Sequence, residues 1–187
     1  MFEHITEETA TRVLDVVDQG LSSGLGNRQP GQMCVEAAVC YALGEPHGDQ
    51  PTCVSPVLRR FKIGLNDARW SSNEARAKGL RRIAIAQLGT TNTLDEQLFV
   101  RKLASVTITK VLPTVLRTVA ALHQEPHKSK LLAAADRCET EGSADAARCA
   151  AAAAAAADQL LSEFAEAVVQ ILVEMNSPGS KFLFLTL

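Results

Sequence analysis

Length, composition and charge set the first bounds on this protein. The chain has 187 residues, of which 47% are hydrophobic and only 4% aromatic, and its formal net charge is −2. This length fits a single domain over residues 1–187, which can fold without a structural metal or disulfide. The near-neutral charge excludes a generally basic protein that coats nucleic acid. The abundance of alanine, valine and leucine favours an all-α fold.

The sequence shows neither a signal peptide nor a membrane span. Acidic residues, among them Glu3, Glu7 and Glu8, occupy the first ten positions, where a signal peptide carries positive charge. We find no apolar run close to the roughly 20 residues that a transmembrane helix needs. We therefore expect a cytoplasmic protein without a membrane partner, in which the five cysteines are reduced.

The N-terminal half predicts four helices separated by loops rich in glycine and proline. Apolar residues recur every three or four positions, and residues typical of helix caps precede them. Ser71-x-x-Glu74 has the spacing of a capping box. The predicted helices run from Thr6 to Gly20, from Gln32 to Leu43, from Ser55 to about Leu65, and from Ser71 to Gly89.

The C-terminal half predicts three more helices. A second capping box, Thr93 to Glu96, opens a long apolar helix that Pro113 should kink or split. Further helices are expected over 128–138 and, through an alanine run, over 144–175. The tail after residue 179 suggests a short extended segment. The sequence thus predicts a compact bundle of about seven helices.

The second predicted helix carries the first candidate site. Cys34 lies near its N-terminus, where the helix dipole favours a thiolate, and His47 is the nearest base along the chain. Asp49 could orient that histidine. The alternative is that Cys34 and Cys40 are small core residues of an apolar helix. The first interpretation makes Cys34, Glu36 and His47 a catalytic group.

A metal site built from Cys34, Cys40, His47 and Cys53 is less well supported. The ligand types suit zinc, but residues six apart on a helix point about 120° away from one another. No Cys-x-x-Cys pair occurs. We therefore expect no metal and no cofactor.

Glu36 is the only charge of the second predicted helix, and burying a lone carboxylate is costly. It therefore predicts either a functional group or a structural ion pair. In the functional interpretation Glu36 is a general base or the partner of a substrate cation. In the structural one it pairs with an arginine of the segment 59–82.

The segment 59–82 itself supports a third site, one for anions. It holds eight basic residues against two acidic ones, whereas residues 1–58 hold two basic and eight acidic residues. A loop with three glycines precedes the second helix, and amides at a helix N-terminus bind phosphate. Neither a P-loop nor a dinucleotide fingerprint occurs. The predicted ligand-binding residues are Gly24, Gly26, Gly31, Arg76, Lys78, Arg81 and Arg82.

Two stretches resemble known kinds of protein. Cys34-Val-Glu-Ala-Ala-Val-Cys-Tyr-Ala-Leu-Gly44, followed by Leu65-Asn66-Asp67 and the box at Ser71, resembles short uncharacterised helical proteins of actinobacteria and phages (residues about 34–88). Those proteins have a tryptophan where Leu65 stands. The stretch 111–175, from Val111-Leu-Pro113 through the alanine run, is similar to alanine-rich helical immunity proteins. The first resemblance implies only a fold element, and the second implies binding of a protein.

These patterns together predict a non-enzymatic binding module, linked to phage or bacterial defence, that engages an acidic protein or a phosphate-bearing ligand. The acidic remainder of the chain disfavours nucleic acid as the partner, although it does not exclude it. The competing interpretation is a cysteine- or metal-dependent enzyme centred on Cys34. A homo-oligomer is compatible with either.

Overall fold

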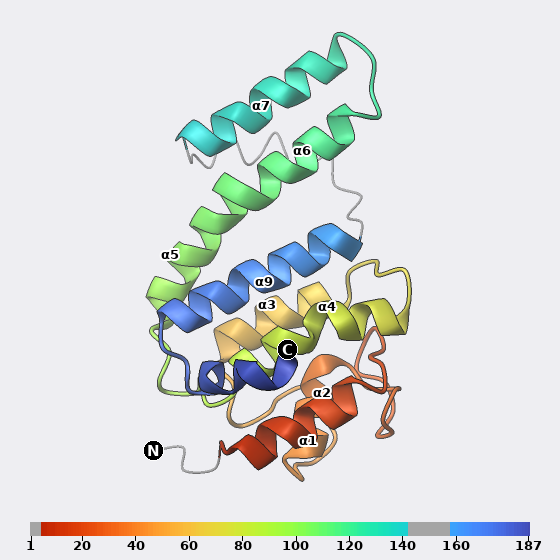
Figure 1. The fold of residues 1–187 in the computed structure, drawn as a ribbon, viewed down its shortest axis with the longest axis vertical. Coiled ribbons are helices and arrows are strands. Elements are labelled where there is room, and N and C mark those ends of the chain that lie inside the picture. Colours follow the sequence, from red (N-terminus) through yellow and green to blue (C-terminus); the bar gives the residue numbers. More distant parts are fainter. Residues whose placement is uncertain (1–4, 142–157) are drawn as a thin grey trace.

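The computed structural model describes residues 5–141 and 158–187, and over these residues the fold is all-α (Figure 1). The described part of the chain contains one isolated β-bridge, between Gly26 and Met33, and no β-sheet. The predicted helix segment at 144–157 lies outside the described residues. The α-helices are α1 (Glu7–Val17), α2 (Val35–Ala42), α3 (Pro56–Asn66), α4 (Asn73–Ala86), α5 (Glu96–Val106), α6 (Leu112–Ala120), α7 (His127–Glu141) and α9 (Asp158–Glu174).

Helix α4 lies at the centre of the body, packed against α1, α2, α9 and the C-terminal segment (Figure 1). Its inward residues include Leu80 and Ile83, which are fully buried. Two glycines allow the close packing around it. A Cβ on Gly79 would lie 2.3 Å from the ring of Trp70, and one on Gly179 would lie 2.1 Å from the carbonyl oxygen of Ile85. Only glycine fits at either contact.

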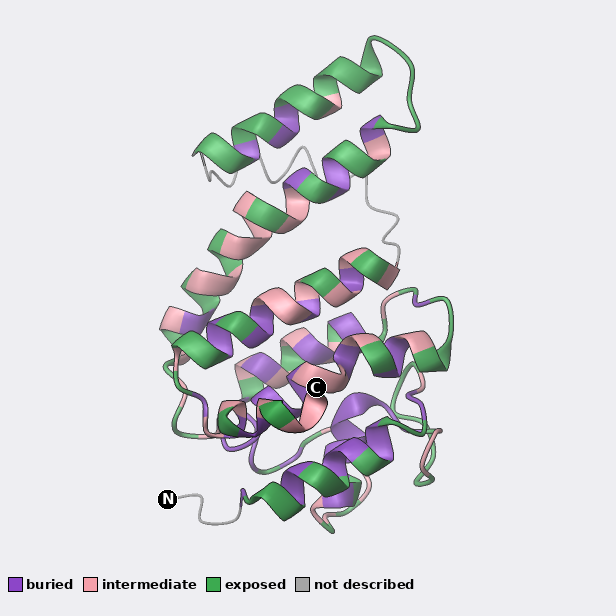
Figure 2. Cartoon of the chain, in the orientation of Figure 1, coloured by how far each residue is buried: buried purple, intermediate pink, exposed green. Residues whose placement is uncertain are grey.

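Helices α5 and α6 form one long rod that leads away from the body, and α7 folds back along α6 (Figure 1). We call the α6–α7 hairpin the arm. It has a small core of its own, made by Leu116, Ala134, Ala135 and Cys138. Most of its remaining surface is exposed, in contrast to the body helices (Figure 2).

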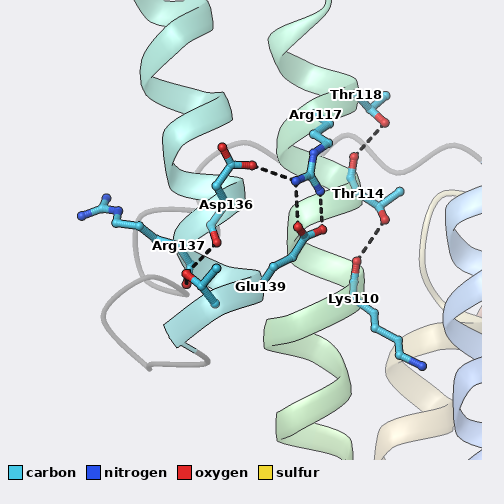
Figure 3. Close-up of polar contacts among 8 residues, drawn as sticks. Lys110, Thr114, Arg117, Thr118, Asp136, Arg137 and Glu139 are labelled. Carbon is cyan, nitrogen blue, oxygen red and sulfur yellow. Dashed lines mark hydrogen bonds and ion pairs between the residues drawn. The ribbon is translucent and has the colours of Figure 1, made fainter.

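Ion pairs and threonine hydroxyls supplement that small core. Arg117 on α6 pairs with Asp136 and Glu139 on α7 at 2.9 and 2.5 Å (Figure 3). The hydroxyl groups of Thr114 and Thr118 donate to the carbonyl oxygens four residues before them (Figure 3). Such bonds satisfy a threonine within a helix. The two helices of the arm are thus joined by a small apolar core and by ion pairs at the surface.

Pro113 does not split the helix, which was one of the two outcomes predicted from the sequence. The rod continues from Glu96 to Ala120, and the irregularity precedes the proline as a π-helical segment, η1 (Thr107–Val111). A π segment widens the helix locally and absorbs a residue that the regular ladder cannot accommodate. By length and composition alone this rod could cross a membrane, a test that helices of soluble proteins also pass. The sequence predicted a long apolar helix here but no membrane span.

Two predicted capping boxes were wrong in register. Ser72, not Ser71, caps α4 and accepts from the amide of Ala75 at 3.1 Å. Ser71 is unavailable because its amide and hydroxyl both donate to Asp158 of α9. Asp95, not Thr93, caps α5, since the Thr93 hydroxyl donates to the carbonyl of Gly89.

Two further boundaries differ from prediction. Helix α2 begins at Val35, and Cys34 is its N-cap. Gln32 stays outside the helix because its carbonyl oxygen accepts a hydrogen bond from the Asn27 amide of the preceding loop. The tail is not extended but forms a 3₁₀ segment, η3 (Pro178–Thr186). Its entry is fixed by the Ser177 hydroxyl, which donates to the carbonyl of Ala86 at the end of α4.

Candidate functional site

The glycine-rich loop 20–31 folds back onto the start of α2. The Cys34 amide donates to the carbonyl of Leu25 at 3.2 Å, and Gly26 pairs with Met33. Gly26 has a φ of +70°, and a Cβ there would lie 1.9 Å from the carbonyl oxygen of Gln32. The loop can therefore take this path only with glycine at position 26.

The corner at the end of α3 fastens the loop to α2. The side-chain oxygen of Asn66 accepts from the Val35 amide, and its nitrogen donates to the carbonyl of Ser22 at 3.0 Å. Asp67 accepts from the Gly24 amide at 2.7 Å. Arg76 of α4 supports the corner from below, donating to the carbonyls of Asn66 and Leu21. We call this group of contacts the corner clamp.

A cavity of about 60 Å³ lies between the loop, α2 and the corner clamp. Its lining runs from the exposed residues Gly24, Leu25 and Asp67 to the buried residues Cys34 and Glu36. The cavity therefore connects the surface with the first turn of α2. The remaining lining residues are Val35, Asp49, Ile63 and Asn66.

Glu36 and Lys62 form a buried ion pair beside this cavity. The Lys62 Nζ lies 3.1 Å from the Glu36 Oε1, and both side chains are fully buried. Among the described residues, neither carboxylate oxygen of Glu36 nor the Lys62 Nζ makes a hydrogen bond of acceptable geometry. Burial raises the pKa of Glu36 despite the opposing charge of Lys62, and it lowers the pKa of Lys62. Both shifts reflect the cost of burying charge.

The nearby cysteines are held as neutral thiols. Cys34, Cys40 and Cys53 are free and buried. The Cys34 sulfur accepts from the Ala37 amide at 3.3 Å and so caps α2. Burial nevertheless raises the pKa of the Cys34 thiol, and burial with the neighbouring Glu45 raises the pKa of Cys40 to about 12. A neutral thiol is a poor nucleophile and a poor metal ligand.

His47 is not part of the cavity lining. Its Nε2 lies 3.0 Å from the carbonyl oxygen of Gly26, and its Nδ1 is buried without a partner among the described residues. The imidazole thus supports the loop from another side. Of the predicted catalytic group, the structure brings Cys34 and Glu36 together at the cavity. Over 5–141 and 158–187 no cluster of three or more histidine, cysteine or acidic residues is placed to hold a metal.

The predicted anion-binding residues are dispersed among other contacts. Arg76 is buried in the corner clamp. Arg81 pairs with Asp18 at 2.7 Å, and Arg82 pairs with Glu166 at 2.8 Å. Lys78 is exposed on α4, beside a groove whose α9 wall carries three acidic residues. Gly24 lines the cavity, whereas Gly26 and Gly31 shape the loop.

No protein-family model, curated protein or solved structure matches this chain. The two resemblances described from the sequence therefore stay predictions. The candidate site rests on its own geometry, and three of its members were missed in the sequence. Lys62 occupies an inward position of α3 together with Leu58 and Leu65, so the apolar spacing held a usable signal. Asn66 and Asp67 entered the sequence analysis only as part of the first resemblance and at the end of the third helix. Their partners lie 31 to 44 residues away, which gave no local signal of their role.

Proposed function

We propose that this chain is a non-enzymatic binding domain that takes a small polar group into the cavity at Glu36. The observation that carries the proposal is a cavity that reaches the surface and whose lining includes Glu36, a buried acid whose two carboxylate oxygens make no hydrogen bond among the described residues. A buried polar atom left unpaired costs free energy, and a bound group or water would remove that cost. A concave site with a few convergent polar groups is the usual form of a ligand site.

The corner clamp supports binding because it fixes the cavity walls before any ligand arrives. Asn66 and Asp67 hold three backbone groups of the loop and of α2. A site whose walls are already ordered loses little conformational freedom when it binds. Catalysis is less well supported, because the thiols are neutral and His47 does not face Cys34 across the cavity.

The test of this proposal is a fragment panel followed by protein-observed NMR. We expect small polar fragments to shift the amide signals of Cys34, Val35 and Glu36. Leu25→Trp places a large ring at the mouth of the cavity, where Leu25 is 43% exposed, and should abolish those shifts. Val100→Trp, at a comparably exposed position on α5, is the control and should leave them unchanged. Fragments that never perturb these amides would rule the proposal out.

A second candidate function, binding of an acidic protein, is favoured by the tip of the arm. Leu122 is 82% exposed there, beside the exposed residues His123, His127, Lys128 and Lys130. The first turn of α7 carries no acidic residue, although cations at a helix N-terminus are unfavourable. The neighbouring Glu125 is held by the hydroxyl of Ser129. An exposed leucine close to two lysines complements an acidic surface that has an apolar centre.

This candidate keeps the predicted acidic partner but moves its contact from α4 to the arm. Charge reversal at Lys128 and Lys130 should abolish binding of an acidic test protein at low salt, whereas reversal at Arg60 and Arg69, two exposed body residues, should not. Equal losses from both pairs would mean non-specific attraction. A cytoplasmic location and a link to phage or bacterial defence rest on the sequence alone, and they belong to this proposal.

A further inference from the structure

We infer that His123 and His127, at the tip of the arm, form a half-site for a divalent transition-metal ion such as zinc. By half-site we mean two protein ligands whose remaining coordination positions are filled from outside the chain. The loop that joins α6 to α7 lies at the end of the arm farthest from the body (Figure 1). The inference goes beyond the proposed function of the cavity and uses none of its residues.

The backbone of the turn brings the two imidazoles together. The Lys128 amide donates to the carbonyl oxygen of Gln124 at 3.2 Å, which closes the turn between the histidines. The His123 amide donates to the carbonyl oxygen of Ala120, at the end of α6, and His127 is the first residue of α7. The two ring centroids lie 6.4 Å apart. The turn therefore fixes both attachment points and places the rings as neighbours.

Both imidazoles are free to bind a metal. The two histidines are exposed, and within 5–141 and 158–187 neither ring makes a hydrogen bond or an ion pair. A histidine kept for structure uses its ring nitrogens on neighbouring groups, as His47 does with the carbonyl of Gly26. Neutral imidazole is the commonest metal ligand among side chains. The pair thus offers two nitrogens that no contact among the described residues occupies.

The distance between the rings is close to that of a chelate. Two imidazoles that bind one zinc ion tetrahedrally, with Zn–N distances of about 2.1 Å, have centroids about 5.3 Å apart. The rings of His123 and His127 need to approach by about 1 Å to reach that separation, given 6.4 Å at present. Exposed side chains make such rotations within nanoseconds. Nitrogen ligands select zinc, nickel or copper, whereas calcium and magnesium prefer oxygen.

The surroundings make the site depend on both histidines. The exposed residues Lys128 and Lys130 and the N-terminus of α7 carry positive charge, which disfavours a cation held by one imidazole alone. The carboxylate of Glu125 accepts from the amide and the hydroxyl of Ser129, and the described residues supply no third ligand. Water or an acidic side chain from outside the chain completes the shell. Such an acidic side chain would also meet the two lysines.

The test is a zinc titration of the untagged full-length protein, followed by calorimetry and by the NMR signals of the imidazoles. Zinc should shift the signals of His123 and His127, and calcium should not. His123→Gln and His127→Gln should each weaken zinc binding at least about tenfold, because either change destroys the chelate. The double variant His127→Gln/Lys128→His is the matched control. It keeps four histidines and removes a repelling charge, but it should bind as weakly as His127→Gln because the new ring leaves the turn in another direction.

The outcomes are separate from those that concern the cavity, because no partner and no cavity ligand is present in this titration. The inference is wrong if zinc leaves both imidazole signals unchanged, or if calcium shifts them as strongly. It is also wrong if either single variant binds zinc within about tenfold of the wild type, or if the double variant regains wild-type affinity. Shifts confined to Cys34 and its neighbours would place the metal on the thiols and would overturn the inference as well.

Discussion

Replacing Lys62 with methionine is the sharpest test of how the candidate site is held together. Methionine keeps the length of the side chain and its apolar contacts but removes the ammonium. Glu36 is then left fully buried beside no counter-charge. The carboxylate must either ionise without a partner or remain protonated, and both states cost free energy relative to the unfolded chain.

The magnitude follows from the geometry of the pair. Two unit charges 3.1 Å apart attract by roughly 5 kcal/mol at an effective dielectric constant of about 20. Breaking a buried pair by removing one partner typically costs about 3–5 kcal/mol. For a domain of this length, each kcal/mol lowers the melting temperature by about 2–4 °C. We therefore expect Lys62→Met to melt roughly 6–20 °C below the wild-type protein.

The assay is thermal and urea denaturation of four proteins that make a double-mutant cycle. They are the wild type, Lys62→Met, Glu36→Leu and the double variant. Apolar replacement of both partners should restore most of the stability, because it removes the desolvation cost along with the attraction. A Lys62→Met protein within about 1 kcal/mol of wild type would refute the reasoning, since it would mean that water already screens the pair.

Three further predictions follow from the site. In Lys62→Met the folded-state pKa of Glu36 stays above its unfolded value. The variant's loss of stability relative to the wild type should therefore be smallest in acid and should grow as the pH rises through that raised pKa. Urea titrations at several pH values measure this loss. Gly26→Ala should cost more than about 1 kcal/mol, and should remove cavity binding, because its Cβ would overlap the Gln32 carbonyl. Cys34 should react with a thiol reagent far more slowly in the folded protein than in urea, since burial raises its pKa; equal rates would show that the cavity admits the reagent freely.

Local patterns predicted the elements of this fold well, because caps and apolar spacing act over a few residues. Thr6 caps α1 as expected, and Ser55-Pro56 opens α3. The same reasoning failed where two adjacent residues competed for one role. Ser71 and Ser72 are equally good caps, and the choice was made by Asp158, 87 residues further along the chain. Long-range partners of this kind leave no local trace.

The candidate site was half predictable for the same reason. The lone charge on α2 left a functional group and a structural ion pair as alternatives for Glu36. The structure contains a buried ion pair, but its partner is Lys62 and not the predicted arginine. The sequence located the basic residues correctly, but it did not show that acidic residues of other helices pair with some of them. Two of its arginines, Arg81 and Arg82, pair with Asp18 at the end of α1 and with Glu166 of α9. A cluster of charge along the sequence is not a patch until its partners in space are known.

The polar groups around Glu36 are arranged in a way that packing alone does not explain. A buried ion pair rarely stabilises a fold more than well-packed apolar residues of similar volume do. A position that served packing alone would therefore be expected to hold apolar residues. Here the charged atoms of the pair make no hydrogen bond among the described residues, and a glycine with positive φ shapes the adjacent loop. Meanwhile Asn66, Asp67 and Arg76 make well-formed bonds that fix the surrounding backbone. Departures from local rules within a rigid frame are the pattern expected where a binding site is kept at the expense of stability.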